Sequence, residues 1–249
     1  MTNVSTAAMR DPEHIARALG VEGKSEVLHL CRGGVHSWVI HAPGFWDLSA
    51  QRVEEVWGNH PEEFVKFKMF GKEVQAPRWQ MFYSDTVNYA FSGFSQKERM
   101  LGDLEECESF ARSTEDCLGV GRGTFNGCMV NWYGAGMGHY IGAHKDDEKS
   151  MVAGAPIFSM TWGATRRFRF TYDPKWDRSG MIPITNIVES VTLSLAHGDL
   201  VVMGGDCQRT HKHEVPKPKK SEDQGRRINM TLRAFWTKGA QHPEKRKRE

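Results

Sequence analysis

The stretch "RRINMTLRAFW" (Arg226–Trp236) alternates polar and apolar side chains with a period of two residues. A β-strand places residues two apart on one face. One face of the predicted strand therefore carries Arg227, Asn229, Thr231 and Arg233, and the other carries Ile228, Met230 and Leu232. The polar face has two interpretations. In the first, the polar face lies in water, as in an ordinary half-exposed sheet. In the second, it lines a pocket in which two guanidinium groups bind a dicarboxylate.

Six further runs of strand-like composition precede this strand in the second half of the chain: "CMVNWY", "PIFSMTWG", "RRFRFTY", "SVTLSL", "DLVVMG" and "HKHEV". Turns rich in Gly, Pro and Asp separate them. The longest helical pattern spans about residues 95–119, with Leu101, Leu104 and Phe110 as its core stripe. Helices followed by a long run of strands predict an α+β fold, an antiparallel barrel or jelly roll with helices on one side.

The first half of the chain carries shorter elements. Residues 27–46 read as short strands interrupted at Gly33, and a helix is expected between the capping residue Ser49 and Gly58. The alternation around Gly71 in "FVKFKMFGKEV" predicts a hairpin. Before them, the first 25 residues are polar and mixed, which predicts a loosely attached arm with one short helix.

The bulk properties exclude several classes of protein. The 249 residues are 39% hydrophobic, which is enough to bury one sizeable core. The net charge is only +2, so any contact with nucleic acid must come from local basic patches. Five scattered cysteines without a CxxC motif favour a reducing compartment. We see neither a secretory signal nor an apolar run of membrane-spanning length, so we expect an intracellular protein without a membrane partner.

A strand would direct His144 and Asp146 to the same side, as two neighbouring ligands of one metal, although a His-x-Asp pair alone also occurs by chance in a chain of this size. The later run "HKHEV" offers a third ligand, but His211 and His213 are two residues apart and periodicity does not choose between them. Two His and one carboxylate form the facial ligand set of non-haem Fe(II) oxygenases. A bound 2-oxo dicarboxylate would complete the charge balance with the two arginines of the polar strand.

These residues lie in segments that resemble the AlkB family of Fe(II)/2-oxoglutarate dioxygenases, most of all its eukaryotic branch that repairs alkylated double-stranded DNA. The resemblance covers about Phe64–Trp236 and follows the order of the family: "PRWQMFY", "YAFSGF", "FNGCMVNWY", "IGAHKDDE", "PIFSMTWGATRRFRF", "GDLVVMGG", "HEVP" and "RINMTLR". It implies a double-stranded β-helix (jelly-roll) core with supporting helices and an N-terminal nucleotide-recognition hairpin region.

By the same resemblance, the chain divides into an arm (1–25), a dioxygenase domain (26–238) and a basic tail (239–249). The domain consists of helices and recognition hairpins (26–125) and the jelly-roll core (126–238).

The resemblance also implies the cofactor and co-substrates, which are Fe(II), 2-oxoglutarate and O2. His144, Asp146 and His213 would ligate the iron, and the context His-x-Val-Pro selects His213. The residues implied for 2-oxoglutarate are Asn131, Tyr133, Arg227, Asn229 and Arg233. Oxidation of an N-methyl group would release formaldehyde, with succinate and CO2 formed from the co-substrate. No role beyond loop packing or a turn is expected for His139 and His197.

Contacts with DNA are implied for two groups of residues. The hairpin tip would insert a finger where the damaged base has flipped out of the stack, formed by Met69, Phe70 and Gly71. Around the flipped base would lie Tyr89, Phe91, Glu148 and Arg78. Lys66, Lys68 and Lys72, together with Arg78, would meet phosphates. The alternative for the aromatic residues is ordinary core packing.

Three functions follow from these observations. The first is oxidative demethylation of 1-methyladenine and 3-methylcytosine in DNA, with the duplex favoured, by a monomer located in the nucleus if the organism is eukaryotic and otherwise in the cytoplasm. The second is the same chemistry on RNA or single-stranded nucleic acid. The third is a non-catalytic nucleic-acid-binding barrel. The finger favours the first, and the complete ligand set argues against the third.

Overall fold

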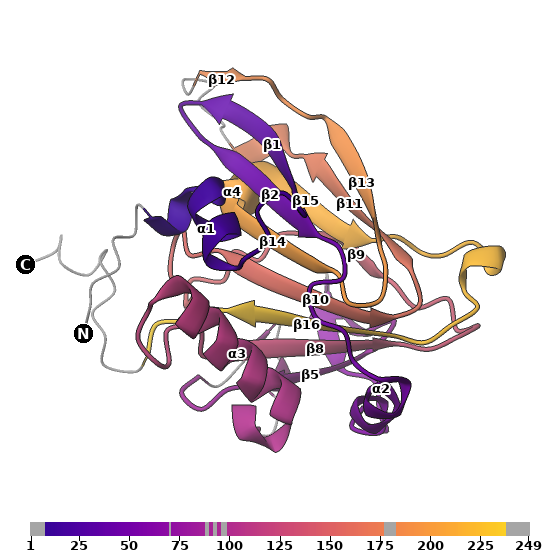
Figure 1. The fold of residues 1–249 in the computed structure, drawn as a ribbon. Helices are drawn as coiled ribbons and strands as arrows, with labels where there is room; N and C mark the ends of the chain where they lie inside the picture. The colour runs from indigo at the N-terminus through magenta and orange to yellow at the C-terminus, as the bar shows by residue number, and fades with distance from the viewer. Residues whose placement is uncertain are drawn as a thin grey trace, which may run out of the picture.

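The computed structural model describes residues 8–69, 71–87, 90–91, 94–95, 99–176 and 183–237. Its main layer is a large antiparallel sheet (Figure 1). In spatial order the strands of this sheet are β12 (Ile184–Thr185), β1 (Glu26–Gly33), β2 (Ser37–Ala42), β14 (Leu200–Gly205), β10 (Ile157–Gly163), β16 (Arg227–Arg233), β8 (Gly127–Tyr133) and β5 (Trp79–Tyr83). The polar strand β16 therefore lies in the middle, between β10 and β8.

A smaller sheet forms the second layer. Its strands, in spatial order, are β13 (Ser190–Leu195), β11 (Arg166–Tyr172), β15 (His211–Val215) and β9 (Ile141–His144). Apolar side chains from both sheets form one buried cluster between them, including Val201 of the large sheet and Phe170 of the small one. Two antiparallel sheets packed face to face in this way agree with the predicted jelly-roll core.

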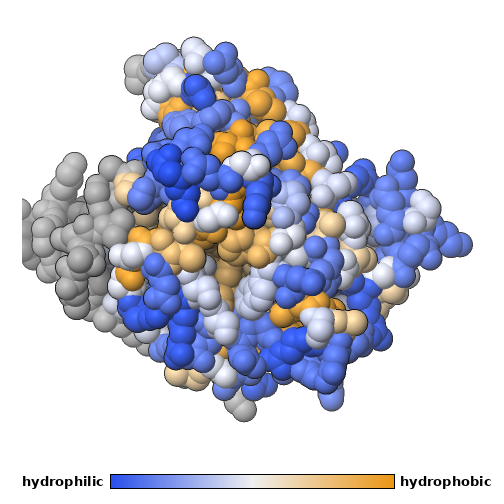
Figure 2. Space-filling view, viewed as in Figure 1, coloured by the Kyte–Doolittle hydropathy of each residue, from blue (hydrophilic) through white to orange (hydrophobic). Residues whose placement is uncertain are grey.

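Helices cover the other face of the large sheet (Figure 1). The helices of the described residues are α1 (Pro12–Ala18), α2 (Ala50–Trp57), α3 (Glu105–Leu118) and α4 (Cys207–Thr210), with 3-10 turns η1 (Ala8–Arg10), η2 (Leu101–Asp103), η3 (Pro174–Trp176) and η4 (Lys220–Glu222). Ile15 of α1 and Phe110 of α3 share a buried cluster with Met230 of β16. In Figure 2, hydrophilic residues cover most of this face and hydrophobic ones gather toward its centre.

Two hairpins complete the described elements. The predicted hairpin around Gly71 is present as β3 (Lys66–Met69) and β4 (Lys72–Gln75), and Gly71 has a φ of 76°. That positive φ is a conformation that glycine adopts without strain. The second hairpin is β6 (Ala90–Phe91) with β7 (Phe94–Ser95). Within the described residues, no helix is both long enough and apolar enough to cross a membrane.

The helix predicted between Ser49 and Gly58 is confirmed as α2. The side chain of Ser49 accepts a hydrogen bond from the Arg52 amide, and Gly58 is the C-terminal cap. The helix predicted from about residue 95 was too long. Leu104 has extended dihedral angles and α3 begins after it. Leu101 and Leu104 are buried as expected, but they lie in the segment before the helix. A prediction of the helix start from buried positions alone is therefore too early.

The short helix expected in the N-terminal arm is present as α1, but the described part of the arm packs on the large sheet and is not loosely attached. Helix α1 has a completely buried residue, Ile15, and Ala16 beside it is also buried. The backbone oxygen of Arg10 accepts a hydrogen bond from the indole of Trp38 in β2 at 2.9 Å. The polar residues that suggested a solvated arm lie on the outer side of a helix whose apolar face packs on the sheet.

Candidate metal centre and cavity

Neighbouring strands of the small sheet bring the predicted metal ligands together. His144 ends β9 and pairs directly with His213 of β15, and their ring centroids are 4.3 Å apart. Asp146 follows two residues after His144. Its Oδ1 lies 3.7 Å from Nε2 of His144, and its Oδ2 lies 3.8 Å from Nε2 of His213. The three potential ligand atoms all lie within 4.8 Å of one another.

His211 lies away from this cluster although it shares a strand with His213. Its Nε2 donates to the carbonyl oxygen of Val188 at 3.0 Å, and its Nδ1 shares a hydrogen bond with Thr210 Oγ1 at 2.8 Å. Both ring nitrogens of His211 therefore have partners inside the fold. The structure makes the choice that periodicity left open, because only His213 of the two approaches Asp146.

The carboxylate of Asp146 is held ionised. Burial by itself would raise its pKa, but the positive charge of Arg233, with smaller contributions from His213 and His144 in their protonated forms, outweighs burial and lowers the pKa to about 2. Arg233 forms a two-point ion pair with it, through Nε to Oδ2 at 3.1 Å and Nη2 to Oδ1 at 2.9 Å. Burial, assisted by His144, lowers the pKa of His213 to about 3.

These protonation states suit a divalent cation, because metals bind ionised carboxylates and neutral imidazoles. The donor set of two His and one carboxylate leaves positions open on an octahedral ion, which is the arrangement of non-haem Fe(II) oxygenases. The 3.7 and 3.8 Å separations are below twice a typical bond of about 2.1 Å to a first-row divalent ion, so one ion can contact both partners of each pair. The residues present therefore fit Fe(II).

A cavity of about 450 Å³ opens beside the three ligands. This volume lies in the range of small-molecule sites, roughly 300–1,000 Å³. The large sheet contributes Asn131, Tyr133, Ser159, Asn229, Thr231 and Arg233 to its wall. The hairpin β3–β4 contributes Phe67 and Val74, which face each other across its two strands. The cavity thus connects the metal ligands, the polar face of β16 and the recognition hairpin.

The polar face of β16 does not face water. All seven residues of the strand are buried, and Ile228, Met230 and Leu232 belong to the core under the helices. Its opposite side is covered by the small sheet and the cavity, so the water-facing interpretation is wrong. Both faces of β16 are instead buried, the apolar face in the core under the helices and the polar face toward the cavity.

Arg227 is the least satisfied residue of this face. It is 1% exposed, its Nη2 donates to Thr161 Oγ1 at 2.9 Å, and its guanidinium lies 4.9 Å from the ring centroid of Tyr133. Its Nε and Nη1 have no hydrogen-bond partner of normal geometry among the described residues. Burial lowers its pKa to about 10, so it stays protonated at neutral pH. Tyr133, not Arg227, forms the cavity wall here.

The two asparagines lie opposite each other on neighbouring strands. Asn229 Nδ2 donates to Ser159 Oγ at 2.8 Å and to the Met160 carbonyl at 2.7 Å. Asn131 Oδ1 accepts a hydrogen bond from Arg78 Nε at 2.6 Å. Arg78 was expected beside both the base and the phosphates, and the structure places it at the cavity wall.

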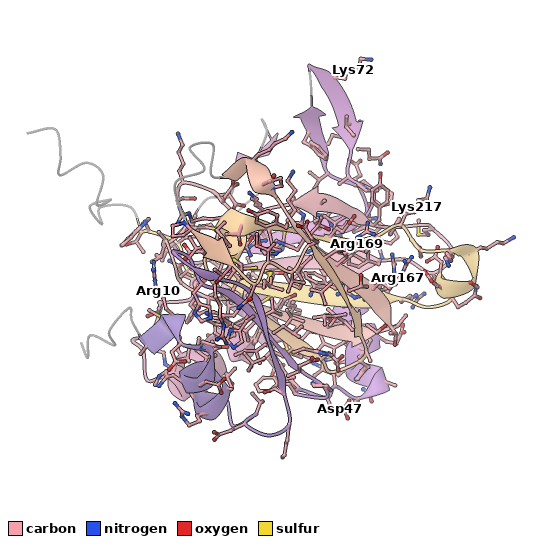
Figure 3. All side chains as sticks on the ribbon, turned by 90° about the horizontal axis from the view of Figure 1, so that it is seen from above. Arg10, Asp47, Lys72, Arg167, Arg169 and Lys217 are labelled. Atoms are coloured by element: carbon pink, nitrogen blue, oxygen red, sulfur yellow. The ribbon has the colours of Figure 1, made fainter. Side chains whose placement is uncertain are left out.

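The remaining predicted residues are placed only in part. Glu148 is half-buried and lines the cavity. Met69 and Phe91 are described in their backbone alone, whereas Phe70 and Tyr89 lie outside the described residues. In Figure 3 the hairpin projects from the body of the molecule, with Lys72 at its outer end. Lys66 of the same hairpin is exposed and lies 3.7 Å from Glu73.

Sequence reasoning missed several residues of this site. Arg166 is 4% exposed and its guanidinium lies 5.5 Å from the ring centroid of Tyr133. His139, given only a packing role, accepts a hydrogen bond from the Gly134 amide through Nδ1 at 3.0 Å. Tyr140 lines the cavity and was not considered. The alternation of "RRFRF" was the available signal for Arg166, because it places that residue on the inner face with Phe168 and Phe170.

The sequence model of the 2OG-Fe(II) oxygenase superfamily matches residues 55–233. The human protein named DNA oxidative demethylase ALKBH2 is 34% identical over 170 residues, which are 68% of this chain and 60% of that protein. The rat alpha-ketoglutarate-dependent dioxygenase alkB homolog 3 is 34% identical over 113 residues, 45% of this chain and 36% of that protein. The mouse ALKBH2 protein is 35% identical over 68% of this chain and 66% of its own length. The chain thus spans about three fifths of the length of the curated relatives it matches.

Proposed function

This chain belongs to the 2OG-Fe(II) oxygenase superfamily, as a member of the AlkB type, and on that premise we propose that it removes N-alkyl groups from DNA bases. Membership of the superfamily implies Fe(II), 2-oxoglutarate and O2. The observation that carries the proposal is the convergence of His144, Asp146 and His213 beside a cavity with a buried cationic wall. The substrates are bases of the 1-methyladenine and 3-methylcytosine type.

Each residue of the site has a task in this reaction. His144, Asp146 and His213 would hold Fe(II), which together with O2 and 2-oxoglutarate supplies the oxidation of the N-methyl carbon. Arg233 fixes the carboxylate of Asp146 through its two-point ion pair. Arg227 lies against Tyr133 and is not itself part of the cavity wall. From there its charge, with Nε and Nη1 that lack a partner of normal geometry among the described residues, would attract the distal carboxylate of 2-oxoglutarate.

The overall reaction balances without another reactant. The N-methyl base, O2 and 2-oxoglutarate give the free base, formaldehyde, succinate and CO2. One oxygen atom enters succinate and the other enters the methyl carbon, where the hydroxymethyl product breaks its C–N bond and leaves as formaldehyde. Asn131 and Asn229 keep the polar wall in place beside the co-substrate, and Glu148 on the cavity wall is placed to contact the edge of the base.

The proposed substrate is duplex DNA with the damaged base flipped out, in the nucleus if the organism is eukaryotic and otherwise in the cytoplasm. The hairpin β3–β4 supports this choice because Phe67 and Val74 line the cavity while Lys72 lies at the projecting end. A hairpin with one apolar side and a basic tip can contact phosphates and fill the space that the flipped base leaves. Relatives named DNA oxidative demethylase also support DNA as substrate.

Mass spectrometry of an oligonucleotide with a single 1-methyladenine tests this function. The duplex and the unpaired strand are each incubated with protein, Fe(II), ascorbate and 2-oxoglutarate in air. We expect loss of one methyl mass, faster in the duplex and absent for His144→Ala. Methyl loss only from the single strand would overturn the duplex preference. Consumption of 2-oxoglutarate without methyl loss from either strand would contradict the DNA substrate and move the search to RNA.

The variant Phe70→Ala separates the finger from the chemistry. If Phe70 fills the space of the flipped base, its removal slows demethylation of the duplex by about tenfold, since base–aromatic stacking contributes about 1–3 kcal/mol. The unpaired strand needs no such wedge, and its rate should stay unchanged. Equal slowing of both substrates would show that Phe70 packs in the fold instead.

A further inference from the structure

Two buried guanidinium groups lie against the same aromatic ring. The centre of the Arg227 guanidinium is 4.9 Å from the ring centroid of Tyr133, and that of Arg166 is 5.5 Å away. They come from different sheets, since Arg227 begins β16 and Arg166 begins β11. Tyr133 is itself 1% exposed and lines the cavity. Tyr133 is therefore a cavity residue that contacts two buried cations from different sheets, neither of which lines the cavity.

Arg166 is fixed by backbone atoms on two segments. Its Nη2 donates to the carbonyl oxygen of His139 at 2.8 Å and to that of Pro216 at 3.1 Å. His139 lies in the loop that follows Tyr133, and Pro216 follows β15, which carries His213. Burial lowers the pKa of Arg166, and the neighbouring Tyr133 and Asp223 oppose that shift. A guanidinium held in this way remains a fixed positive charge at neutral pH.

The negative charge around this pair is incomplete. Of the neighbouring carboxylates, Asp223 has the largest effect on the pKa of Arg166. Asp223 is buried, and its Oδ2 accepts a hydrogen bond from the Gly138 amide at 2.6 Å. Among the described residues, Arg227 takes part in no ion pair, and the largest influences on its pKa are burial, Tyr133 and Arg166. Within the part of the chain that the structure describes, these two buried cations thus have one buried carboxylate nearby, Asp223, and one exposed carboxylate, Glu222, which also pairs with Arg167. Because an unpaired buried charge is costly, the arrangement is complete only when a further anion binds.

We propose that Arg166 is a positioning residue for the distal carboxylate of the co-substrate, one that fixes Tyr133 against Arg227 and favours 2-oxo dicarboxylic acids over 2-oxo monocarboxylic acids. The inference rests on the proposed function, because it takes 2-oxoglutarate as the bound anion. Arg166 does not line the cavity, so it acts through Tyr133 and through its charge. The cationic wall then has two layers, with Arg227 nearer to the anion.

The test compares two ligands of equal carbon-chain length on the Mn(II)-loaded protein. 2-Oxoglutarate carries the distal carboxylate, and 2-oxopentanoate lacks it. Affinities are measured by ligand-dependent thermal shift, which requires neither turnover nor DNA. The variant is Arg166→Gln. Its matched control is Arg167→Gln, because Arg167 is the next residue of β11 but faces outward and pairs with the exposed Glu222 at 3.0 Å.

We expect Arg166→Gln to weaken 2-oxoglutarate binding by about tenfold, as the loss of one nearby charge at reduced dielectric predicts. Binding of 2-oxopentanoate should change less than about twofold, and Arg167→Gln should leave both affinities unchanged. Arg166→Lys, which keeps the charge but not the guanidinium fork, should give an intermediate affinity for 2-oxoglutarate.

A purely structural role for Arg166 predicts a different pattern. Equal weakening of both ligands, or no change in either, would overturn the proposal. If Arg166→Gln does not fold, Arg166→Met gives the same comparison, because an apolar chain of similar length replaces the buried charge. The affinity of the wild-type protein for 2-oxoglutarate tests the proposed function independently of the role of Arg166. If the wild-type protein does not bind 2-oxoglutarate at all, the proposed function fails together with the role of Arg166.

Discussion

The two faces of strand β16 are equally buried and chemically opposite. Met230 on one face is 0% exposed and packs under the helices, whereas Arg227 on the other is 1% exposed and lies beside Tyr133. The apolar face contacts side chains that fill the space around it. The polar face contacts a cavity, and Arg227 keeps two nitrogen atoms without a partner of normal geometry among the described residues.

The two faces of β16 contribute to different properties of the protein, the apolar face to stability and the polar face to the proposed function. Burying apolar side chains stabilises the fold, whereas burying guanidinium groups without matched anions opposes folding. We infer that β16 gains its stability from the apolar face and uses the polar face to bind a ligand. Changes on the apolar face should therefore unfold the protein, and changes on the polar face should spare the fold while abolishing binding.

The largest effect is expected for His213→Ala, which removes a metal ligand. Loss of a residue that only hydrogen-bonds to a metal ligand lowers activity by ~10–100-fold. Loss of the ligand itself should lower the rate of demethylation by more than this. Binding of Mn(II), followed by calorimetry, should weaken in parallel. The control is His211→Gln on the same strand, because His211 is bonded to Thr210 and Val188 away from the site. A similar loss in both variants would show that the strand, not the ligand, was damaged.

Met230→Ala tests the apolar face. A methionine truncated in a filled core costs about 2–5 kcal/mol of unfolding free energy, because the cavity left behind collapses only partly. Urea denaturation of the metal-free protein measures that cost. At temperatures where the variant stays folded, its affinity for 2-oxoglutarate with Mn(II) should match the wild type. A weakened affinity with unchanged stability would invert the assignment of the two faces.

Arg227→Met tests the polar face in the opposite sense. The variant should lose about 10–100-fold in affinity for 2-oxoglutarate, since hydrogen bonds to charged groups contribute roughly 1.5–3 kcal/mol. Its unfolding free energy without ligand should equal or exceed that of the wild type, because an apolar chain replaces an uncompensated buried charge. Marked destabilisation of the ligand-free variant would mean that Arg227 is a structural residue.

The smallest effect concerns pH and His139. Burial lowers the pKa of His139 below its usual value, so the folded state holds it neutral. As pH falls below about 6.5, the unfolded chain binds a proton that the folded chain resists, and stability decreases by up to ~1.4 kcal/mol per pH unit. This contribution is fully present above pH 6.5. In His139→Gln, urea midpoints should depend less on pH between 7.5 and 5.5, and parallel curves would contradict the assignment.

The sequence predicts which residues share a face of β16, because strand geometry alone requires that grouping. It does not predict that both faces are buried, since that depends on the small sheet packing over Asn229 and Thr231. The same limit applies to His211 and His213, which periodicity treats alike. In the structure, His211 is removed from the choice by its hydrogen bonds to the neighbouring Thr210 and to the distant Val188. The resemblance to AlkB proteins also selected His213.

Arg166 and the start of α3 show why other features escaped prediction. Arg166 is separated from Tyr133 by more than thirty positions, and only the turn between β10 and β11 brings its guanidinium to that ring. Leu104 has the burial of a helical core residue but an extended backbone. In both cases local composition is compatible with two structures, and long-range packing decides between them.

We propose that the buried polar face and the three ligands form one site for a metal and a dicarboxylate. Isothermal titration of 2-oxoglutarate into the protein, with and without Mn(II), tests it most directly. We predict binding of one molecule per chain that is much tighter with Mn(II), because the 2-oxo acid end would contact the metal while the distal carboxylate would be attracted by Arg227. Equal binding with and without Mn(II), or no binding in either case, would show that the polar face and the three ligands do not form one site.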